Sequence, residues 1–214
     1  MLDIKKIYTK LYLYGVRIIV WDFDGTLYQD ESAGDYIKQR YIKFVNKYTK
    51  IDEAGFDKLS NQLGRWSTVT AKLLKMDEIE VMDSVESDEK YVLHLKKNRE
   101  LVSRIEQLSS YSQFILTNSS SRGVAQGLRM LGFKKHNTNS IYPFVKIFSR
   151  DVTNILKPNA GALGQVLAYT KAPPSSHLVI GDSDREDLIP AKKLGCKTAH
   201  VDKFWNDFWP SLLE

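Results

Sequence analysis

Short apolar runs that end in polar or glycine-containing turns recur along the chain, and each predicts a β-strand. These runs are residues 17–21, 113–116, 177–180 and 197–201, with a weaker fifth at 146–148. Between several of them, apolar residues recur at the spacing of one helix face, and two such stretches end at Gly132 and Gly195, as helices commonly do. Strands that alternate with helices predict a parallel sheet covered on both faces.

The stretch from residue 30 to residue 104 has a different pattern. It offers no convincing strand, and its apolar positions follow helical spacing, most clearly between Tyr36 and Tyr48. We therefore predict a small all-helical domain over 30–104, inserted into an α/β domain that consists of residues 1–29 and 105–214.

Composition and charge narrow the possible partners. The chain has 214 residues, 43% of them hydrophobic, which is enough to bury a sizeable core. Its net charge is +5, and because the charges within 30–104 balance, the excess belongs to the α/β domain. Such a modest excess attracts anions but is weak evidence for nucleic acid. We expect a small phosphorylated metabolite as partner, and no nucleic acid.

The N-terminal segment does not have the pattern of a membrane anchor. Lysines interrupt the apolar residues of 1–17, and no other run approaches the length needed to cross a membrane. We predict that this segment forms an amphipathic helix packed on the core, with peripheral membrane contact as the alternative. The single cysteine, Cys196, cannot form an internal disulfide. A soluble, cytoplasmic protein without a membrane partner is the expectation.

Two carboxylates stand at the end of the first predicted strand. The strand runs into D-F-D-G-T-L, so Asp22 and Asp24 lie two residues apart at the edge of a parallel sheet where ligands bind. In an extended chain they would face the same side and reach one substrate. Gly25 and Thr26 then permit a sharp turn. Taken alone, the same letters also fit a calcium-loop fragment or an ordinary turn.

Two further segments bring groups suited to an anion. The second strand ends at Thr117 and Asn118, just before a serine run that begins a helix, and hydroxyl and amide groups at a helix N-terminus suit a phosphoryl oxygen. A plain helix cap is the alternative interpretation. In the later segment I-L-K-P-N, the Lys157 ammonium could neutralise a carboxylate and a phosphate together.

The fourth predicted strand ends in the acidic sequence G-D-S-D-R-E-D. So many acids repel one another unless a hard cation or basic side chains lie among them, and a small set of oxygen ligands favours Mg²⁺. A solvated acidic turn at a helix start explains Glu186 and Asp187 well. It explains Asp182 poorly, because this residue directly follows apolar strand residues.

Together, D22-F-D-G-T, T117-N, K157-P and G181-D-S-D-R-E-D occur in the order of the four motifs of the haloacid dehalogenase superfamily, which the chain resembles. The resemblance implies a Rossmann-like, doubly wound parallel sheet with strand order 5-4-1-2-3. It also implies a helical cap inserted between the first two motifs, which matches the helical stretch identified above.

The resemblance also implies site residues. Four would be catalytic: Asp22 as nucleophile, Asp24 as acid and base, Thr117 as a donor to a phosphoryl oxygen, and Lys157 as a balancing charge. The implied Mg²⁺ ligands are Asp22, the backbone carbonyl of Asp24, Asp182 and Asp187. For the last position, the spacing also leaves Glu186 open. Further phosphate contacts are expected from Asn118, Gly25 and Thr26.

These assignments predict a Mg²⁺-dependent phosphatase that hydrolyses a small phosphate monoester through an aspartyl-phosphate intermediate. A sugar-phosphate mutase and a catalytically silent phosphate-binding module are the alternatives. A dehalogenase is disfavoured because that reaction does not need the second carboxylate, and Asp24 is present. Tyr28 is expected to pack at the hinge of the cap, with a position at the entrance to the site as the alternative.

Overall fold

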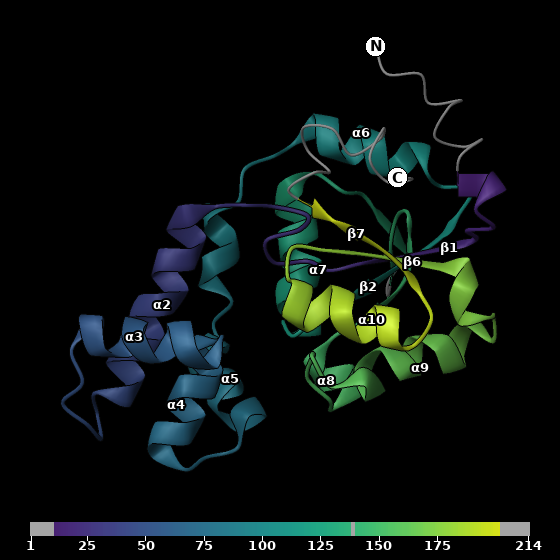
Figure 1. Cartoon of the computed structure of the whole chain (residues 1–214). Coiled ribbons are helices and arrows are strands. Elements are labelled where there is room, and N and C mark those ends of the chain that lie inside the picture. Colours follow the sequence, from purple (N-terminus) through teal and green to yellow (C-terminus); the bar gives the residue numbers. More distant parts are fainter. Residues whose placement is uncertain (1–10, 138–139, 202–214) are drawn as a thin grey trace. The chain divides into compact units, whose positions relative to one another are not determined.

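The computed structural model describes residues 11–137 and 140–201 and contains two compact units. The core unit combines the chain up to Gln29 with the chain from Lys96 onward, and the helical unit consists of Asp30–Leu95. Figure 1 shows the elements of each unit. The first boundary coincides with the predicted one, whereas the second lies at residue 96 rather than at residue 105.

The core unit is built on a five-stranded, fully parallel sheet with the order β5-β2-β1-β6-β7. Its strands are β1 (Ile18–Trp21), β2 (Ser112–Leu116), β5 (Phe144–Phe148), β6 (His177–Gly181) and β7 (Lys197–His200). Counted along the chain within this sheet, the order is the expected 5-4-1-2-3. The predicted Rossmann-like parallel sheet is therefore confirmed.

Helices cover the two faces of this sheet, and alternate residues of β1 are buried against them. Ile18 and Val20 belong to an apolar cluster with residues of α9 (Ala160–Thr170) and α10 (Ile189–Lys193). Ile19 and Trp21 face the opposite side, and both are at most 1% exposed. A strand buried on both faces explains why the first predicted run is continuously apolar.

Helix α6 (Arg99–Gln107) lies within the core unit, although the predicted insert extended through most of it. Leu101 and Ile105 are fully buried, and the Gln113 side chain donates to the Ile105 carbonyl oxygen at 3.0 Å while accepting from the Trp21 indole at 2.9 Å. This buried polar bridge connects α6 to β1 and β2. The apolar stripe that made α6 resemble part of the insert thus packs on the sheet.

The remaining elements of the core unit connect the strands. They are α7 (Ser121–Leu131), the antiparallel pair β3 (Lys135–Asn137) and β4 (Ser140–Ile141), α8 (Arg150–Thr153), η2 (Pro174–Ser176) and the π-helical turn η3 (Asp184–Leu188). Helix α7 ends at Gly132, whose φ of +107° favours glycine, as the sequence predicts.

The elements described in the helical unit are all helices. They are α2 (Glu31–Val45), α3 (Glu53–Leu63), α4 (Trp66–Leu74), α5 (Glu78–Glu86) and the 3₁₀-helix η1 (Lys90–His94). Asp30, Asp52 and Asp77 cap the first turns of α2, α3 and α5 with side-chain hydrogen bonds. The unit has its own apolar cluster, to which α2, α3, α4 and α5 all contribute.

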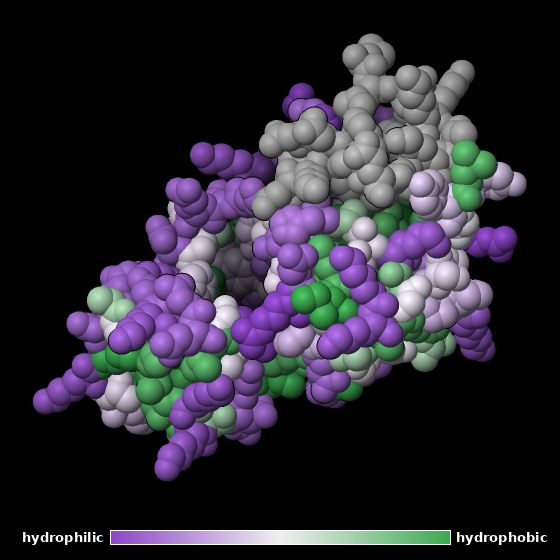
Figure 2. Space-filling model, in the orientation of Figure 1, coloured by the Kyte–Doolittle hydropathy of each residue, from purple (hydrophilic) through white to green (hydrophobic). Residues whose placement is uncertain are grey.

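The surface shown in Figure 2 is dominated by hydrophilic side chains on both units, and smaller apolar areas are scattered among these side chains. Of residues 11–137 and 140–201, none forms part of a helix long and apolar enough to cross a membrane. The predicted N-terminal helix lies mostly outside the described residues. Residues 11–13 are helical, and Leu11 is buried.

Candidate active site

The strand ends hold the first two motifs rigidly at the carboxyl edge of the sheet. The Asp22 amide donates to the Ile180 carbonyl oxygen at 2.8 Å, and the Thr117 amide donates to that of Phe148 at 3.0 Å. Both residues thus continue the backbone hydrogen-bond ladder beyond β1 and β2. Their side chains therefore start from fixed backbone positions.

Three carboxylates from separate parts of the chain meet at this edge. Asp22, Asp182 and Asp187 each offer one oxygen, and these oxygens lie within 4.8 Å of one another. The Thr26 hydroxyl lies 3.1 Å from Asp22 Oδ2 and 3.5 Å from Asp182 Oδ1, so it is located between the two carboxylates. The predicted convergence of Asp22 and Asp182 at a single rim is therefore present.

Glycine is required beside two of these carboxylates. Gly25 has a φ of +79°, and a Cβ added there would lie 2.3 Å from Asp182 Oδ2. A Cβ at Gly181 would lie 2.4 Å from Asp187 Oδ2. Any side chain at either position would displace an acid of the cluster. A direct phosphate contact by Gly25 or Thr26 stays a prediction.

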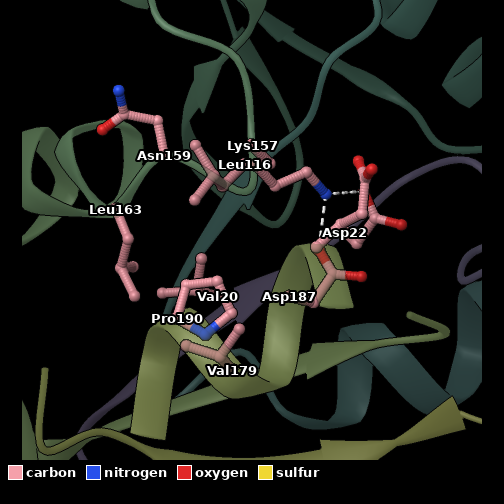
Figure 3. Close-up of a pocket in the computed structure, with 10 residues that line it drawn as sticks. Val20, Asp22, Leu116, Lys157, Asn159, Leu163, Val179, Asp187 and Pro190 are labelled. Carbon is pink, nitrogen blue, oxygen red and sulfur yellow. Dashed lines mark hydrogen bonds and ion pairs between the residues drawn. The ribbon is translucent and has the colours of Figure 1, made fainter. Parts of the chain in front are cut away.

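The Lys157 ammonium lies between two of the acids, as Figure 3 shows. Its Nζ is 2.5 Å from Asp22 Oδ1 and 2.6 Å from Asp187 Oδ1. Apolar residues, among them Val20 and Leu116, line the same small pocket. Asp22, Lys157 and Asp187 are all buried, and burial strengthens the charge interactions among them.

Burial and crowding displace the pKa values of these groups in a consistent way. Burial raises the pKa of Asp22 well above its ordinary value, against the lowering effect of Lys157, and the neighbouring acids raise it further. Burial and then Asp187 raise the pKa of Asp182 as well. Burial alone would lower the pKa of Lys157, but Asp187 and Asp22 outweigh it and raise this pKa above its ordinary value.

The cluster carries more negative than positive charge. Among residues 11–137 and 140–201, three carboxylates lie beside the Lys157 ammonium, so the acids repel one another unless a further cation binds. The donor set consists of carboxylate oxygens, which suits a hard divalent ion such as Mg²⁺. The residues present therefore fit the metal that the sequence predicts.

Asp24 is held by a different set of partners, all of them hydroxyl groups. Tyr28 donates to Asp24 Oδ1 at 2.5 Å, Ser119 donates to Oδ2 at 2.5 Å, and Thr117 donates to Oδ2 at 3.3 Å. The Tyr28 ring also packs edge-on against Phe23, with a centroid distance of 5.2 Å. Tyr28 therefore packs beside the hinge and also orients the second acid.

Asn118 contacts the protein through its whole carboxamide. Oδ1 accepts from the Lys157 amide at 2.8 Å, and Nδ2 donates to the Lys157 carbonyl oxygen at 3.1 Å and to Glu186 Oε2 at 3.2 Å. The sequence predicts a phosphate contact for Asn118 in a segment whose hydroxyl and backbone amides suit a phosphoryl oxygen, and that contact stays a prediction. In the structure the side chain joins the second motif to the third and the fourth.

The structure assigns different surroundings to the two candidate acids of the fourth motif. The Asp187 carboxylate belongs to the charged cluster, whereas Glu186 accepts from Asn118. Both lie in the π-helical turn η3, and Ser183 donates its backbone N–H to Asp187 Oδ2 at 3.2 Å. The geometry thus places Asp187, the first choice on sequence grounds, in the carboxylate cluster that could hold a metal ion.

Two residues that contact the motifs were not identified from the sequence. Ser119 lies in a serine run that reads as a helix cap, but the cap of α7 is its neighbour Ser120, which leaves Ser119 for Asp24. Arg150 is 1% exposed, and its backbone N–H and its guanidinium donate to the carbonyl oxygens of Ser119 and Asn118. The sequence gives no signal that predicts a role for Arg150, because it lies outside the four motifs and follows the weakest predicted strand.

Solved structures share this fold at low sequence identity. YfnB from Bacillus subtilis, described as a putative HAD-hydrolase bound to magnesium, is 19% identical, with 86% of this chain and 88% of that chain covered and a TM-score of 0.54. A HAD phosphatase from Thermococcus onnurineus is 22% identical, with 86% of each chain covered and a TM-score of 0.56. CbbY from Rhodobacter sphaeroides in complex with phosphate is 17% identical, with 86% and 84% covered and a TM-score of 0.61.

No curated protein sequence matches the chain. A family model described as haloacid dehalogenase-like hydrolase matches residues 19–201, a span that includes all four motifs. The order of the strands and the convergence of the motifs at one edge agree with that match. The chain therefore belongs to the family of haloacid dehalogenase-like hydrolases.

Proposed function

We propose that this protein is a Mg²⁺-dependent phosphatase that hydrolyses a small phosphate monoester through an aspartyl phosphate on Asp22. The observation that carries the proposal is the cluster of three carboxylates, two of them paired with the Lys157 ammonium, in the part of the chain that the structure describes. Its excess negative charge suits a divalent cation, and a cation is what allows a phosphate anion to approach a carboxylate nucleophile.

Each side chain of the site has a proposed task. Mg²⁺ would be held by the carboxylates of Asp22, Asp182 and Asp187 together with the backbone carbonyl of Asp24. When bound, the ion draws charge from the phosphoryl oxygens and shields Asp22 from them. Lys157 opposes the effect of burial on the pKa of Asp22 and so favours the ionised carboxylate, since its ammonium lies 2.5 Å away.

The reaction would proceed in two transfers. Asp22 attacks phosphorus while Asp24, in its protonated form, gives its proton to the leaving oxygen. Asp24 then takes a proton from the water that attacks the aspartyl phosphate, which restores both acids. Thr117 donates a hydrogen bond to a phosphoryl oxygen. The three hydroxyl partners of Asp24 support this proposal, because they hold that carboxyl group in a defined orientation.

The neighbouring structures support the substrate class. CbbY is bound to phosphate and, in a mutant form, to xylulose-1,5-bisphosphate, and YfnB is bound to magnesium. L-2-haloacid dehalogenase from Xanthobacter autotrophicus shares the fold too. The presence of Asp24 with its hydroxyl partners favours phosphate ester hydrolysis over dehalogenation. We propose a small phosphorylated metabolite as the substrate.

Phosphate release from a panel of phosphorylated metabolites and from p-nitrophenyl phosphate tests the proposal directly. We expect release with Mg²⁺ and its loss when EDTA removes the metal. Transfer of phosphate between two positions of a bisphosphate, without net release, would point to a mutase instead. Measurable Mg²⁺ binding with no turnover of any ester would show a phosphate-binding module and refute the phosphatase.

Magnesium binding should also increase the stability of the folded protein. At about 100 times its dissociation constant, a ligand that binds the folded state stabilises it by about 2.7 kcal/mol. We expect Mg²⁺ to raise the melting temperature of the wild-type protein and to have little effect on Asp182→Asn, which lacks one carboxylate of the cluster. Without Mg²⁺, Asp182→Asn should melt at or above the wild-type temperature because repulsion among the acids is reduced. If Mg²⁺ raises the melting temperatures of both proteins equally, Asp182 is not a ligand of the metal.

Removing the Tyr28 hydroxyl tests the orientation of Asp24. Tyr28→Phe keeps the ring contact with Phe23 but loses the hydrogen bond to Asp24 Oδ1, so we expect kcat to fall by about tenfold with a smaller change in KM. Tyr48→Phe, at an exposed tyrosine of the helical unit, is the matched control. If kcat is unchanged in Tyr28→Phe, this hydroxyl has no part in placing the acid.

A further inference from the structure

The backbone of Lys157 lies outside the helices and strands. It is part of the segment between α8 and α9, whereas Asp22 and Thr117 are held by the hydrogen-bond ladder of the sheet. Nevertheless, its ammonium lies within 2.6 Å of two carboxylates. A lysine side chain has many rotamers, so a fixed ammonium requires a fixed backbone as well.

The Asn118 carboxamide supplies a hydrogen-bond pair that a neighbouring strand would otherwise provide. It accepts from the Lys157 N–H and donates to the Lys157 carbonyl oxygen, so one side chain binds both polar groups of one residue. The orientation of this amide is determined, because only its oxygen can face the N–H of Lys157.

The hydrogen-bond capacity of the Asn118 carboxamide argues against a phosphate contact through this side chain. Its Nδ2 carries two hydrogens, and these point to the Lys157 carbonyl oxygen and to Glu186 Oε2. A carboxylate 3.2 Å away would also repel an incoming phosphate. The Asn118 main chain is itself anchored, since the buried Arg150 guanidinium donates to its carbonyl oxygen.

We infer that Asn118 is a positioning residue, which clamps the Lys157 backbone so that the ammonium bridges Asp22 and Asp187, and that its side chain does not bind the phosphoryl group. The catalytic consequence of this clamp rests on the proposed function. The clamp itself is a structural claim. A displacement of about 1 Å in a catalytic site can cost roughly a hundredfold in rate, so loss of the clamp should be visible in turnover.

Two variants test the clamp. Asn118→Ala removes all three side-chain hydrogen bonds, and Asn118→Asp keeps the shape and the acceptor but replaces the donor by a charge that faces Glu186. With p-nitrophenyl phosphate and Mg²⁺, we expect kcat to fall roughly tenfold to a hundredfold in both, with KM changed by less than about threefold. Asn61→Asp, the same chemical change at an exposed position of α3, should retain wild-type kcat.

A double-mutant cycle with Lys157→Met distinguishes the clamp from a direct phosphate contact. If Asn118 acts through Lys157, then Asn118→Ala should cost less than about twofold in kcat/KM when Lys157 is already methionine. Independent effects that multiply, or a loss expressed mainly in KM, would overturn the inference.

Crystal structures of Asn118→Ala and Asn118→Asp test the clamp independently of turnover. We expect the Lys157 ammonium to leave its position between Asp22 and Asp187. An ammonium that stays within hydrogen-bond distance of both carboxylates overturns the clamp even if no ester is hydrolysed. If instead the wild-type protein hydrolyses no ester but the ammonium moves in the variants, the proposed function fails and the clamp stands.

Discussion

Asp22→Asn is expected to reduce the rate of phosphate release by a factor on the order of 10⁴ or more, which is the usual effect of removing a catalytic nucleophile. The amide has nearly the shape of the carboxylate but is a far weaker nucleophile, so no aspartyl phosphate can form. The measurement is release of inorganic phosphate with saturating Mg²⁺. Asp35→Asn, at an exposed position of α2, makes the same chemical change away from the site and should remain fully active.

The same variant should keep its fold, because Asp22 is under electrostatic strain in the wild-type protein. Burial raises its pKa well above the ordinary value near 3.8, so the folded state binds this proton more tightly than the unfolded state does. Stability from this group is therefore largest below the ordinary value and declines as the pH rises through the raised pKa. At neutral pH, without metal, Asp22→Asn should melt no lower than wild type. Full phosphate release by a well-folded Asp22→Asn would refute the nucleophile assignment.

The inner strands β1, β2 and β6 could be predicted from the sequence because they are buried on both faces and therefore read as continuous apolar runs. The motifs at the strand ends could be located for the same reason. The order of the strands followed from the family resemblance. β5 was the weakest prediction because Val145 is 51% exposed and the polar Lys146 interrupts its apolar pattern. The other edge strand, β7, is half-buried.

The boundary at α6 could not be predicted, since an amphipathic pattern reveals a buried face but not the core against which it packs. What joins α6 to the sheet is a hydrogen-bond bridge through Gln113, a buried polar residue that looks like an ordinary strand position in the sequence. Similarly, Asn118 and Ser119 are residue types that commonly cap helices, and only their coordinates show that they contact Lys157 and Asp24 instead.

The ambiguity between Glu186 and Asp187 has a related cause. Both residues lie in a π-helical turn, which contains one residue more per hydrogen-bonded loop than an α-helix. Counting positions from the strand end with α-helical spacing therefore cannot decide which acid turns toward the cluster. The turn directs Asp187 to Lys157 and leaves Glu186 beside Asn118.

Lys157→Met is expected to destabilise the metal-free protein by about 3–5 kcal/mol at neutral pH, because it leaves buried carboxylates without their counter-ion. The pKa of Lys157 is raised above the ordinary lysine value, so its stabilising effect is fully present at neutral pH and is lost only as the pH rises through that raised pKa. The deficit of the variant should shrink as the pH is lowered, since Asp22, whose pKa is raised by burial, can then take up a proton. It should also shrink with Mg²⁺, which replaces the missing charge. Urea unfolding at several pH values, with and without Mg²⁺, measures each effect.

Lys38 provides the matched control for this prediction, because its ammonium also lies between two carboxylates. Its Nζ is 2.9 Å from Glu53 and 2.8 Å from Asp57, but these acids are 54% and 43% exposed. Water screens such a surface cluster, so Lys38→Met should cost much less stability than Lys157→Met, and its deficit relative to wild type should be the same with and without Mg²⁺. Equal losses in the two variants would mean that burial adds nothing to the charge pairing at Lys157. The hypothesis that repulsion among the buried acids favours a metal ion at this edge would then be wrong.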